Sequence, residues 1–257
     1  GSDMDRMIYT ALNSLSNSRF DQRVNAQNLA NLNVPGFKKD LSTVRASTFL
    51  ANMDQYQSRY FAQASQETLF SSQNGAIQRT DERMDFAIRD QGYFFIEPKN
   101  GADVALSRRG DFAITADRFL TDGAGNFMLD NDMNKINVPQ NRDLIIDESG
   151  VVLIEPIDAP DGTRQQIAIL GTTLAEDAQL VKSIDGYIRP YNKNEMPVAD
   201  QRAEVAQGFL EGSNATALDA LLANIEGQRY FELNVKFIKE AKNLDEATTR
   251  IMRLPGT

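Results

Sequence analysis

The sequence predicts an α+β protein with a mainly antiparallel β central domain that is flanked by long N- and C-terminal helices. Apolar residues recur at helical spacing at both ends of the chain, and short apolar runs separated by turn pairs fill its middle. No helical stretch of about 10 to 15 residues lies between those runs, as a parallel βαβ sheet would require. An antiparallel sheet is therefore favoured.

The N-terminal helix is predicted over residues 4–33. The apolar residues of its first half lie three or four positions apart and share one face: Met4, Ile8, Leu12 and Leu15. Small and polar side chains continue this face, so the helix needs a partner in order to fold. It is expected to end near Asn31 to Asn33.

A turn follows this helix and leads into an extended connector, which is predicted over residues 34–74. Pro35 disfavours a helical conformation of Val34, and Pro35-Gly36 is a turn pair. From about Leu41 to Ser72 the connector is rich in Gln and Ser and shows neither helical nor strand periodicity.

A β-rich outer domain is predicted over residues 75–205. The expected strands are AIQRT, MDFAIRD, YFFIEP, FAIT, FMLD, INVP, LIIDES, VVLIEP, QIAILGTTLA and YIRPY, separated by turn pairs such as Asp122-Gly123. Because these runs and turns are self-contained, the range is expected to fold without the termini. Alternation predicts that four of its apolar residues share one buried sheet face: Phe86, Ile88, Phe94 and Ile96.

The C-terminal segment, residues 206–257, is assigned to the second helix. Helical periodicity runs from Ala217 to about Arg253, with Ser213 and Asn214 as candidate N-caps. A helix of this length would extend for roughly 55 Å at about 1.5 Å per residue. Its one glycine, Gly227, is either a tolerated weak point or a place of close helix approach, and the first interpretation is favoured.

The composition excludes several classes of protein. A net charge of −9 and a pI near 4.7 argue against a nucleic-acid partner, which needs clustered Lys and Arg. The absence of Cys and His excludes disulfides, thiolate or imidazole metal sites and a Ser-His-Asp triad. No window approaches the roughly 18 consecutive apolar residues of a membrane span, and the N-terminus lacks a cleaved secretory signal pattern. No membrane insertion is expected.

Two motifs that imitate binding loops are better explained as turns. The run Asp122-Gly123-Ala124-Gly125 lacks the third glycine of a dinucleotide loop, and a hairpin is the favoured interpretation. Asp130, Asp132 and Asn134 resemble the start of a calcium loop, but Lys135 occupies the glycine position, so a polar turn is favoured.

Charged pairs give no stronger indication of chemistry. Adjacent acids such as Asp147-Glu148 point to opposite faces of a strand and do not indicate convergence for acid-base work. Arg108-Arg109 could contact an anion, but a solvated strand end or a local ion pair is favoured. The sequence therefore predicts no enzyme and no catalytic residue, cofactor or metal site.

Four motifs in order along nearly the whole chain resemble those of the bacterial flagellar rod and hook proteins, the axial protein family. They are the opening MDRMIYTA with NLANLNVPGFK, the block MDFAIRDQGYFFI, the block SRRGDF, and the closing QGFLEGSN with RYFE downstream. Within this family, the opening and the length are most similar to members of the proximal rod.

The resemblance implies a structural subunit without enzymatic activity, which assembles helically into the tubular axle that transmits torque to the hook. The terminal helices would pair as an inner helical domain, with the β domain outside it. The implied partners are other rod subunits, copies of the chain itself and the flagellar export apparatus. The implied location is the periplasm-spanning rod of the basal body, reached by type III export without a cleaved signal peptide.

The residues expected to form the assembly interface lie on the two terminal helices. They are Ile8, Leu12, Leu15, Asn28, Leu29, Asn31, Leu218, Leu221, Ile225, Phe231, Val235 and Ile238. The turn of Pro35, Gly36 and Phe37 is expected to determine where the first helix ends and the rest of the chain begins. The amides of Asn25, Asn28 and Asn31 are expected to be satisfied by neighbouring chains.

Three alternatives remain open at this stage. The terminal helices could pack on the β domain of a monomer, and the chain could be a distal-rod or hook-class axial protein. A secreted β-rich hydrolase that uses carboxylates is the remote alternative, and it requires Asp and Glu side chains that converge in a cleft.

Overall fold

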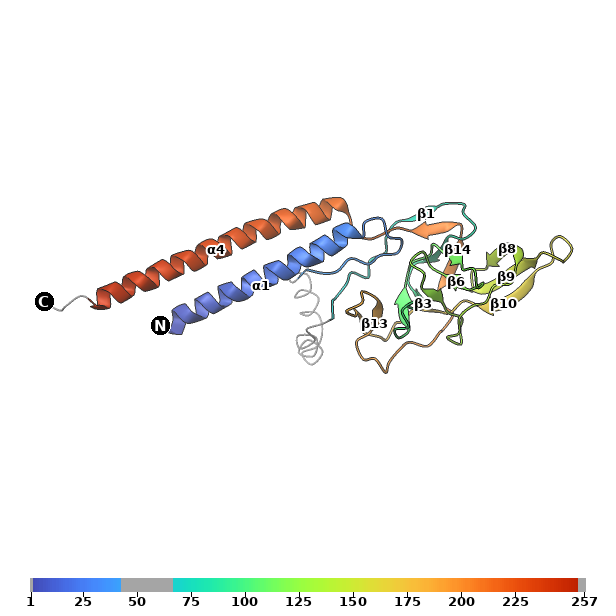
Figure 1. Ribbon diagram of the computed structural model, residues 1–257, viewed down its shortest axis with the longest axis horizontal. Coiled ribbons are helices and arrows are strands. Elements are labelled where there is room, and N and C mark those ends of the chain that lie inside the picture. The colour runs from blue at the N-terminus through green and yellow to red at the C-terminus, as the bar shows by residue number, and fades with distance from the viewer. Residues whose placement is uncertain (1, 43–66, 254–257) are drawn as a thin grey trace. The chain divides into compact units, whose positions relative to one another are not determined.

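The computed structural model describes residues 2–42 and 67–253 and divides the chain into two compact units. Among the described residues, the helical unit contains 2–30, 40–42 and 216–253, and the β unit contains 31–39 and 67–215. Figure 1 shows the two helices of the first unit and the strands of the second. The predicted class, α+β with a mainly antiparallel β centre and a long C-terminal helix, is confirmed.

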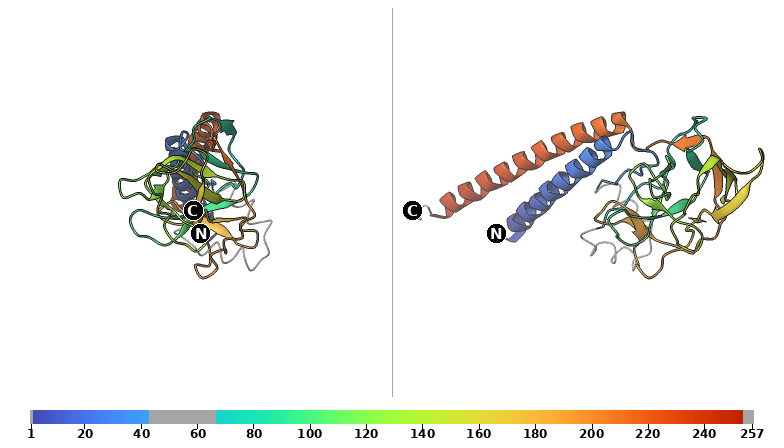
Figure 2. Two further views of the ribbon diagram at one scale, coloured as in Figure 1. Left: turned by 90° about the vertical axis from the view of Figure 1, so that its right-hand side faces the viewer. Right: turned by 45° about the vertical axis from the view of Figure 1, so that its right-hand side comes forward.

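The helical unit contains α1 (Ser2–Ala30) and α4 (Ala217–Arg253), of 29 and 37 residues. The two helices lie side by side and run in opposite directions, as the views in Figures 1 and 2 agree. Near one end of the pair, the side-chain amide of Asn25 donates a hydrogen bond of 2.7 Å to the carbonyl of Ala220. Acidic Asp3 and Asp5 in the first turn of α1 complement the positive end of its dipole.

The ends of the helices differ in part from the predictions. Thr216, and neither Ser213 nor Asn214, caps α4, because its hydroxyl accepts the N–H of Asp219 at 3.1 Å. The two expected caps bond elsewhere in the β unit. Helix α1 ends at Ala30, and a turn follows directly.

The β unit is built from short antiparallel strands. They are β1 (Ile77–Arg79), β2 (Phe86–Arg89), β3 (Tyr93–Glu97), β4 (Ala105–Ser107), β5 (Ala113–Ile114), β6 (Leu120–Thr121), β7 (Phe127–Met128), β8 (Asn141–Ile146), β9 (Val151–Pro156), β10 (Gln165–Ile169), β11 (Thr172–Thr173), β12 (Leu180–Lys182), β13 (Ile188–Pro190), β14 (Glu204–Gln207) and β15 (Phe209–Glu211). Every strand pairing among the described residues is antiparallel.

The strands form four sheets. The largest follows the order β12-β13-β4-β3-β7-β6-β5, with β11 paired to β3, and a three-stranded sheet follows β10-β9-β8. The other two are the pairs β14-β2 and β1-β15. The last two strands, β14 and β15, therefore pair with the first two strands of the unit, β2 and β1.

The four alternating apolar residues are buried, as predicted, and belong to one core cluster. They come from two sheets instead of one, because β2 pairs with β14 while β3 lies in the large sheet. Phe112 joins the two, since its ring stacks on Phe86 at 4.9 Å and meets the edge of Phe94 at 5.3 Å. The opposite face of β3 carries Phe95 into a second cluster.

The β unit extends beyond the predicted range. Strands β14 and β15 run past position 205 into the range assigned to the C-terminal helix, and that helix begins only at Ala217. The INVP run makes one isolated bridge, from Asn137 to Phe119, and no strand, whereas β4, β6 and β12 lie where no strand was expected. Of the predicted connector, 34–39 belong to the β unit, and 43–66 lie outside the described residues.

The two turn predictions are confirmed. Asp122 and Asn126 close a hairpin between β6 and β7, with the Asp122 carboxylate accepting three hydrogen bonds. Burial raises the pKa of this carboxyl group, although those hydrogen bonds and Arg109 act in the opposite direction. The carboxylate of Asp130 likewise accepts the N–H groups of Asp132 and Asn134. Neither described helix is long and apolar enough to cross a lipid bilayer.

The changed boundary gives a first prediction, which compares two fragments. Fragment 31–215 should melt cooperatively, and fragment 75–205 should not, because the shorter one lacks β15, the partner of β1, and half of β14. Thermal melting followed by circular dichroism, with a dye that reports exposed apolar surface, makes the comparison. Equal melting temperatures for the two fragments would contradict this boundary.

Candidate assembly site

One narrow face of α4 is covered, and it faces α1. Its residues lie seven, four, three, four and three positions apart, which fits the 3.5 repeat of a helix packed along its length: Ala220, Gly227, Phe231, Asn234, Ile238 and Ala241. Ala220 is buried and the other five are half-buried, while every other described residue of α4 is exposed. We call these six residues the seam.

Two exposed apolar stripes lie outside the seam. The first occupies the opening turns of α4 and contains Leu218, Leu221, Leu222 and Ile225. Leu218 and Leu222 each stand two positions from Ala220, about 200° around the helix, and so project away from α1.

The second stripe follows the rest of α4 and contains Tyr230, Leu233, Phe237, Leu244 and Ile251. Tyr230, Leu233 and Phe237 each precede a seam residue by one position, so they lie about 100° to one side of it. The helix therefore offers apolar side chains in two further directions besides the seam, whereas a helix on a monomer surface usually has one apolar face.

The helices carry no net charge although the chain does. Helix α1 contains three acidic and three basic residues, and α4 contains six of each. The whole excess of nine negative charges therefore lies outside the two helices. Copies of the helical unit can approach one another without the charge repulsion that the rest of the chain would add.

The residues that were expected to form the assembly interface differ in their exposure to solvent. Leu12, Leu29, Leu218, Leu221, Ile225 and Val235 are exposed, whereas Phe231 and Ile238 lie in the seam and Ile8 is half-buried. The side chain of Leu15 lies outside the described part of the chain. The amides of Asn25 and Asn28 are satisfied within the chain, by Ala220 and by the backbone of Asp40, so neighbouring chains are not needed for them.

Parts of three motif blocks meet in the β unit around the expected turn: the end of NLANLNVPGFK, the block SRRGDF and the block QGFLEGSN. The N–H of Gly36 donates to the carbonyl of Glu211 at 2.9 Å, and the N–H of Asn214 donates to the carbonyl of Phe37 at 3.0 Å. Gly36 has a φ of +68°, and a Cβ there would lie 2.4 Å from the carbonyl carbon and oxygen of Arg108. Only glycine satisfies both constraints.

A buried ion pair holds these segments together. Arg108 donates from Nε and Nη2 to the two carboxylate oxygens of Glu211, at 2.8 and 3.0 Å. Its remaining bonds go to the carbonyls of Gly92 and Ile88. Both side chains are almost completely buried, so the bidentate geometry compensates the desolvation of two charges.

Two lysines complete this cluster, which we call the motif clamp: Gly36, Phe37, Lys38, Arg108, Lys182, Glu211 and Asn214. The Lys38 ammonium lies 3.8 Å from Glu211 and donates to the carbonyl of Gln73. Burial lowers its pKa from 10.5 to about 8, with Glu211 opposing the shift and Arg108 adding to it. The Lys182 ammonium donates to the carbonyl of Lys38 and lies 4.1 Å from the centre of the Phe37 ring.

The environment of Arg108 differs from the prediction, and Glu211 carries a role that its sequence did not indicate. Arg109 forms the predicted local ion pair, with Asp111 at 2.8 Å, but Arg108 is neither solvated nor locally paired. Its partner lies 103 positions away. The available signal was that both residues stand inside motif blocks of the recognised family, SRRGDF and QGFLEGSN.

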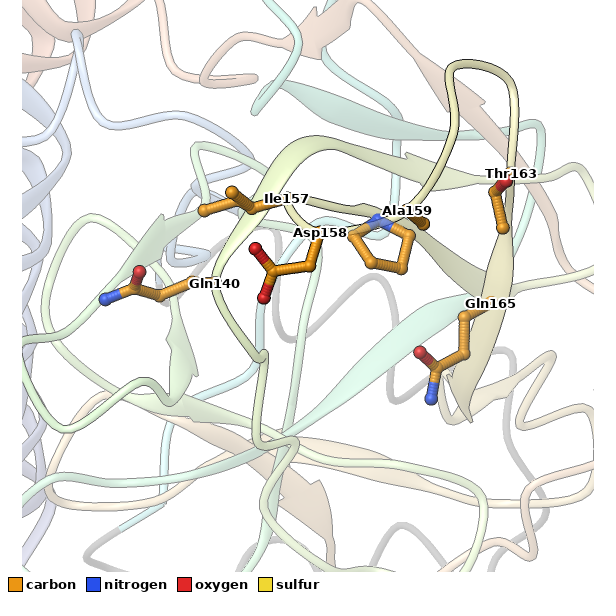
Figure 3. Close-up of a pocket in the computed structure, with 7 residues that line it drawn as sticks. Gln140, Ile157, Asp158, Ala159, Thr163 and Gln165 are labelled. Carbon is orange, nitrogen blue, oxygen red and sulfur yellow. The ribbon is translucent and has the colours of Figure 1, made fainter.

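The pockets of the β unit do not resemble a catalytic cleft. Figure 3 shows the pocket beside β9 and β10, where Gln140 and Gln165 lie at opposite ends with Asp158 between them. Asp158 is the only carboxylate in its lining. The lining of a second pocket contains four acidic residues, Glu176, Asp177, Glu195 and Asp200. Arg202 donates to the carboxylates of Glu176 and Asp200, at 2.7 and 3.5 Å, and so neutralises part of this charge. No cluster of three potential metal ligands occurs in residues 2–42 and 67–253.

Comparison with known proteins identifies the family. A model described as the flagellar hook protein FlgE/F/G D1 domain matches residues 87–154, and one described as the flagellar basal body rod FlgEFG protein C-terminal matches residues 206–251. These matches and the relatives below support a flagellar basal-body rod protein. This family is structural and not enzymatic.

Several relatives align along nearly the whole chain. The flagellar basal-body rod protein FlgF of Salmonella typhimurium is 27% identical over 247 residues, covering 91% of this chain and 93% of the relative. The FlgF protein of Escherichia coli is 27% identical with the same coverage. The rod protein FlgG of Bacillus subtilis is 26% identical, covering 97% of this chain and 100% of the relative. The resemblance found in the sequence is confirmed.

A second prediction concerns the ion pair of the motif clamp. Glu211→Gln should lower the free energy of unfolding of the β unit by about 3 to 5 kcal/mol, because it leaves the buried Arg108 guanidinium without its counter-charge. Asp81→Asn is the matched control, since the pair of Asp81 with Arg79 is exposed and should contribute far less than the buried pair. Denaturant unfolding measures both, and equal losses would refute the role of burial.

A third prediction uses the pH dependence of Lys38. The folded state binds fewer protons than the unfolded state between pH 8 and 10.5, so the stability contributed by this residue should rise through that window. The rise should be on the order of 3 kcal/mol and absent in Lys38→Met. Denaturant unfolding of both chains at several pH values isolates it, because other titrating groups are shared. Parallel pH curves would contradict the assigned shift.

Proposed function

We propose that this chain is a subunit of the proximal rod and that it assembles helically through α1 and α4. The structural role in the basal-body rod follows from the family. The observation that supports assembly through the helices is their exposed apolar surface, because Leu218 and Leu221 are 66% and 57% exposed although each is a large apolar side chain.

The direction of these surfaces supports a helical assembly. The first stripe of α4 projects away from α1, and the second lies to one side of the seam. A copy that offers different surfaces to different neighbours makes heterologous contacts, and a heterologous contact whose rotation does not close generates a filament. A symmetric dimer would instead use one self-complementary patch.

Electrostatics supports the same division of roles. The neutral helices are suited to contact between copies, and the negative charge outside them favours exposure to solvent. In this proposal α1 and α4 form the inner helical domain, and the β unit forms the outer domain.

The family places the chain in the flagellar basal body, where rod proteins assemble with other rod and hook subunits. We further propose that copies of the chain contact one another and that the flagellar export apparatus delivers it to the periplasm-spanning rod. The distal rod is the second candidate position, and the relatives do not favour it over the proximal rod. Imaging of tagged subunits in partly assembled basal bodies would separate the two.

A fourth prediction tests assembly through the helices. Leu221→Asp and Leu12→Asp should abolish rod incorporation and motility and leave the melting of the β unit unchanged, because each places a charge where apolar contact is needed. Ile184→Asp is the matched control, since Ile184 is an equally apolar side chain that is 84% exposed in the turn between β12 and β13. Normal motility of both helix variants would exclude this mode of assembly.

A further inference from the structure

Four of the six seam residues of α4 are small or polar, because three are Ala or Gly and a fourth is Asn234. Phe231 and Ile238 are its only two large apolar residues, and other large side chains such as Leu218, Leu233 and Phe237 lie outside it. A seam made in this way gains little from burial when α1 and α4 pack only against each other.

Asn234 is the one seam residue with an uncompensated polar atom. Its amide nitrogen has less than 1 Å² of accessible surface and no hydrogen-bond partner. On α1 the amide nitrogens of Asn25 and Asn28 donate to backbone carbonyls at 2.7 and 3.0 Å, whereas the buried Ser18 hydroxyl also lacks a partner. The pairing with α1 therefore removes the Asn234 donor from water and leaves it without an acceptor.

An unsatisfied buried donor opposes the pairing that buries it. In helices that associate through a repeating seam, a single buried asparagine selects register and partner at a cost in stability. An apolar residue at position 234 would favour the lone helix pair, so asparagine there is unfavourable unless another packing arrangement supplies an acceptor.

We propose that Asn234 is a specificity-determining residue for assembly, and that a second copy of this chain supplies the acceptor that its amide lacks in the free subunit. This inference rests on the proposed function. The seam adjusts when copies associate, and the gained hydrogen bond favours the assembled packing over the isolated helix pair.

The position of Asn234 supports a second copy as the partner. Leu233 directly precedes it, and Tyr230 and Phe237 extend the same exposed stripe along one side of the seam. A helix of another copy that covers this stripe lies beside Asn234. Both helices are electrically neutral, so charge repulsion does not oppose that contact.

The first part of the test uses the full chain as a dilute free subunit. Asn234→Ala should slow hydrogen exchange of the α4 amides about tenfold relative to the parent chain, because it removes the unsatisfied donor. Asn243→Ala is the matched control, since Asn243 is exposed on the same helix and reports the gain from helix propensity alone. Equal gains for the two variants would overturn the inference.

The second part measures incorporation into the rod and motility in cells that lack the parent chain. Asn234→Ala and Asn234→Leu should reduce both at least severalfold, although neither weakens the free helix pair, whereas Asn243→Ala should behave as the parent. Full motility of both Asn234 variants would refute the specificity role. If the parent chain itself restores no motility, the proposed rod function fails, and hydrogen exchange still decides whether the Asn234 amide destabilises the free pair.

Discussion

The bidentate ion pair between Arg108 and Glu211 is the interaction on which the β unit depends. It joins the residue that follows β4, an inner strand of the large sheet, to β15, and β15 pairs with β1 at the start of the unit. The same guanidinium donates to the carbonyl of Ile88 in β2 and to that of Gly92 directly before β3. Apolar residues of these segments pack beside the ion pair. The bidentate geometry of the pair tolerates little displacement, so it restricts how the segments can shift relative to one another.

The two units differ in how much apolar surface they bury and in the charge they carry. The β unit buries its aromatic residues, satisfies its turns with aspartate side chains and retains the excess negative charge of the chain. The helical unit buries little, its two helices carry no net charge, and many of its large apolar side chains are exposed. In a free subunit the β unit therefore has a buried core, whereas the helices leave apolar side chains exposed. This is expected for a structural protein whose final environment is an assembly.

Local signals in the sequence were sufficient for the helices and for most of the longer strands. The spacing of apolar residues placed α4 at Ala217–Arg253, and Pro35 with Gly36 marked the end of α1. Strands of two residues such as β6 cannot show a period, and β14 was missed because the helical pattern further along dominated the assignment of that segment.

The motif clamp and the seam depend on contacts between distant parts of the chain. Arg108 and Glu211 have no local pattern that pairs them, and adjacency to Arg109 favoured a surface interpretation. Helical spacing predicted that Phe231 and Leu221 belong to one apolar surface, but it could not tell which of them faces α1. That distinction follows from the position of the partner helix, which is a property of tertiary packing.

The arrangement of the motif clamp has a mechanical consequence. The stretch of the β unit that continues into α1 and the stretch that continues into α4 are joined by parallel links: Gly36 to Glu211, Phe37 to Asn214, and the N–H of Lys39 to the Asn214 side chain at 2.6 Å. Tension applied at the helices reaches these links together instead of one after another. Hydrogen bonds that share a load break less readily than hydrogen bonds loaded one at a time, so joining the two stretches at three points strengthens their junction against a pull on either stretch.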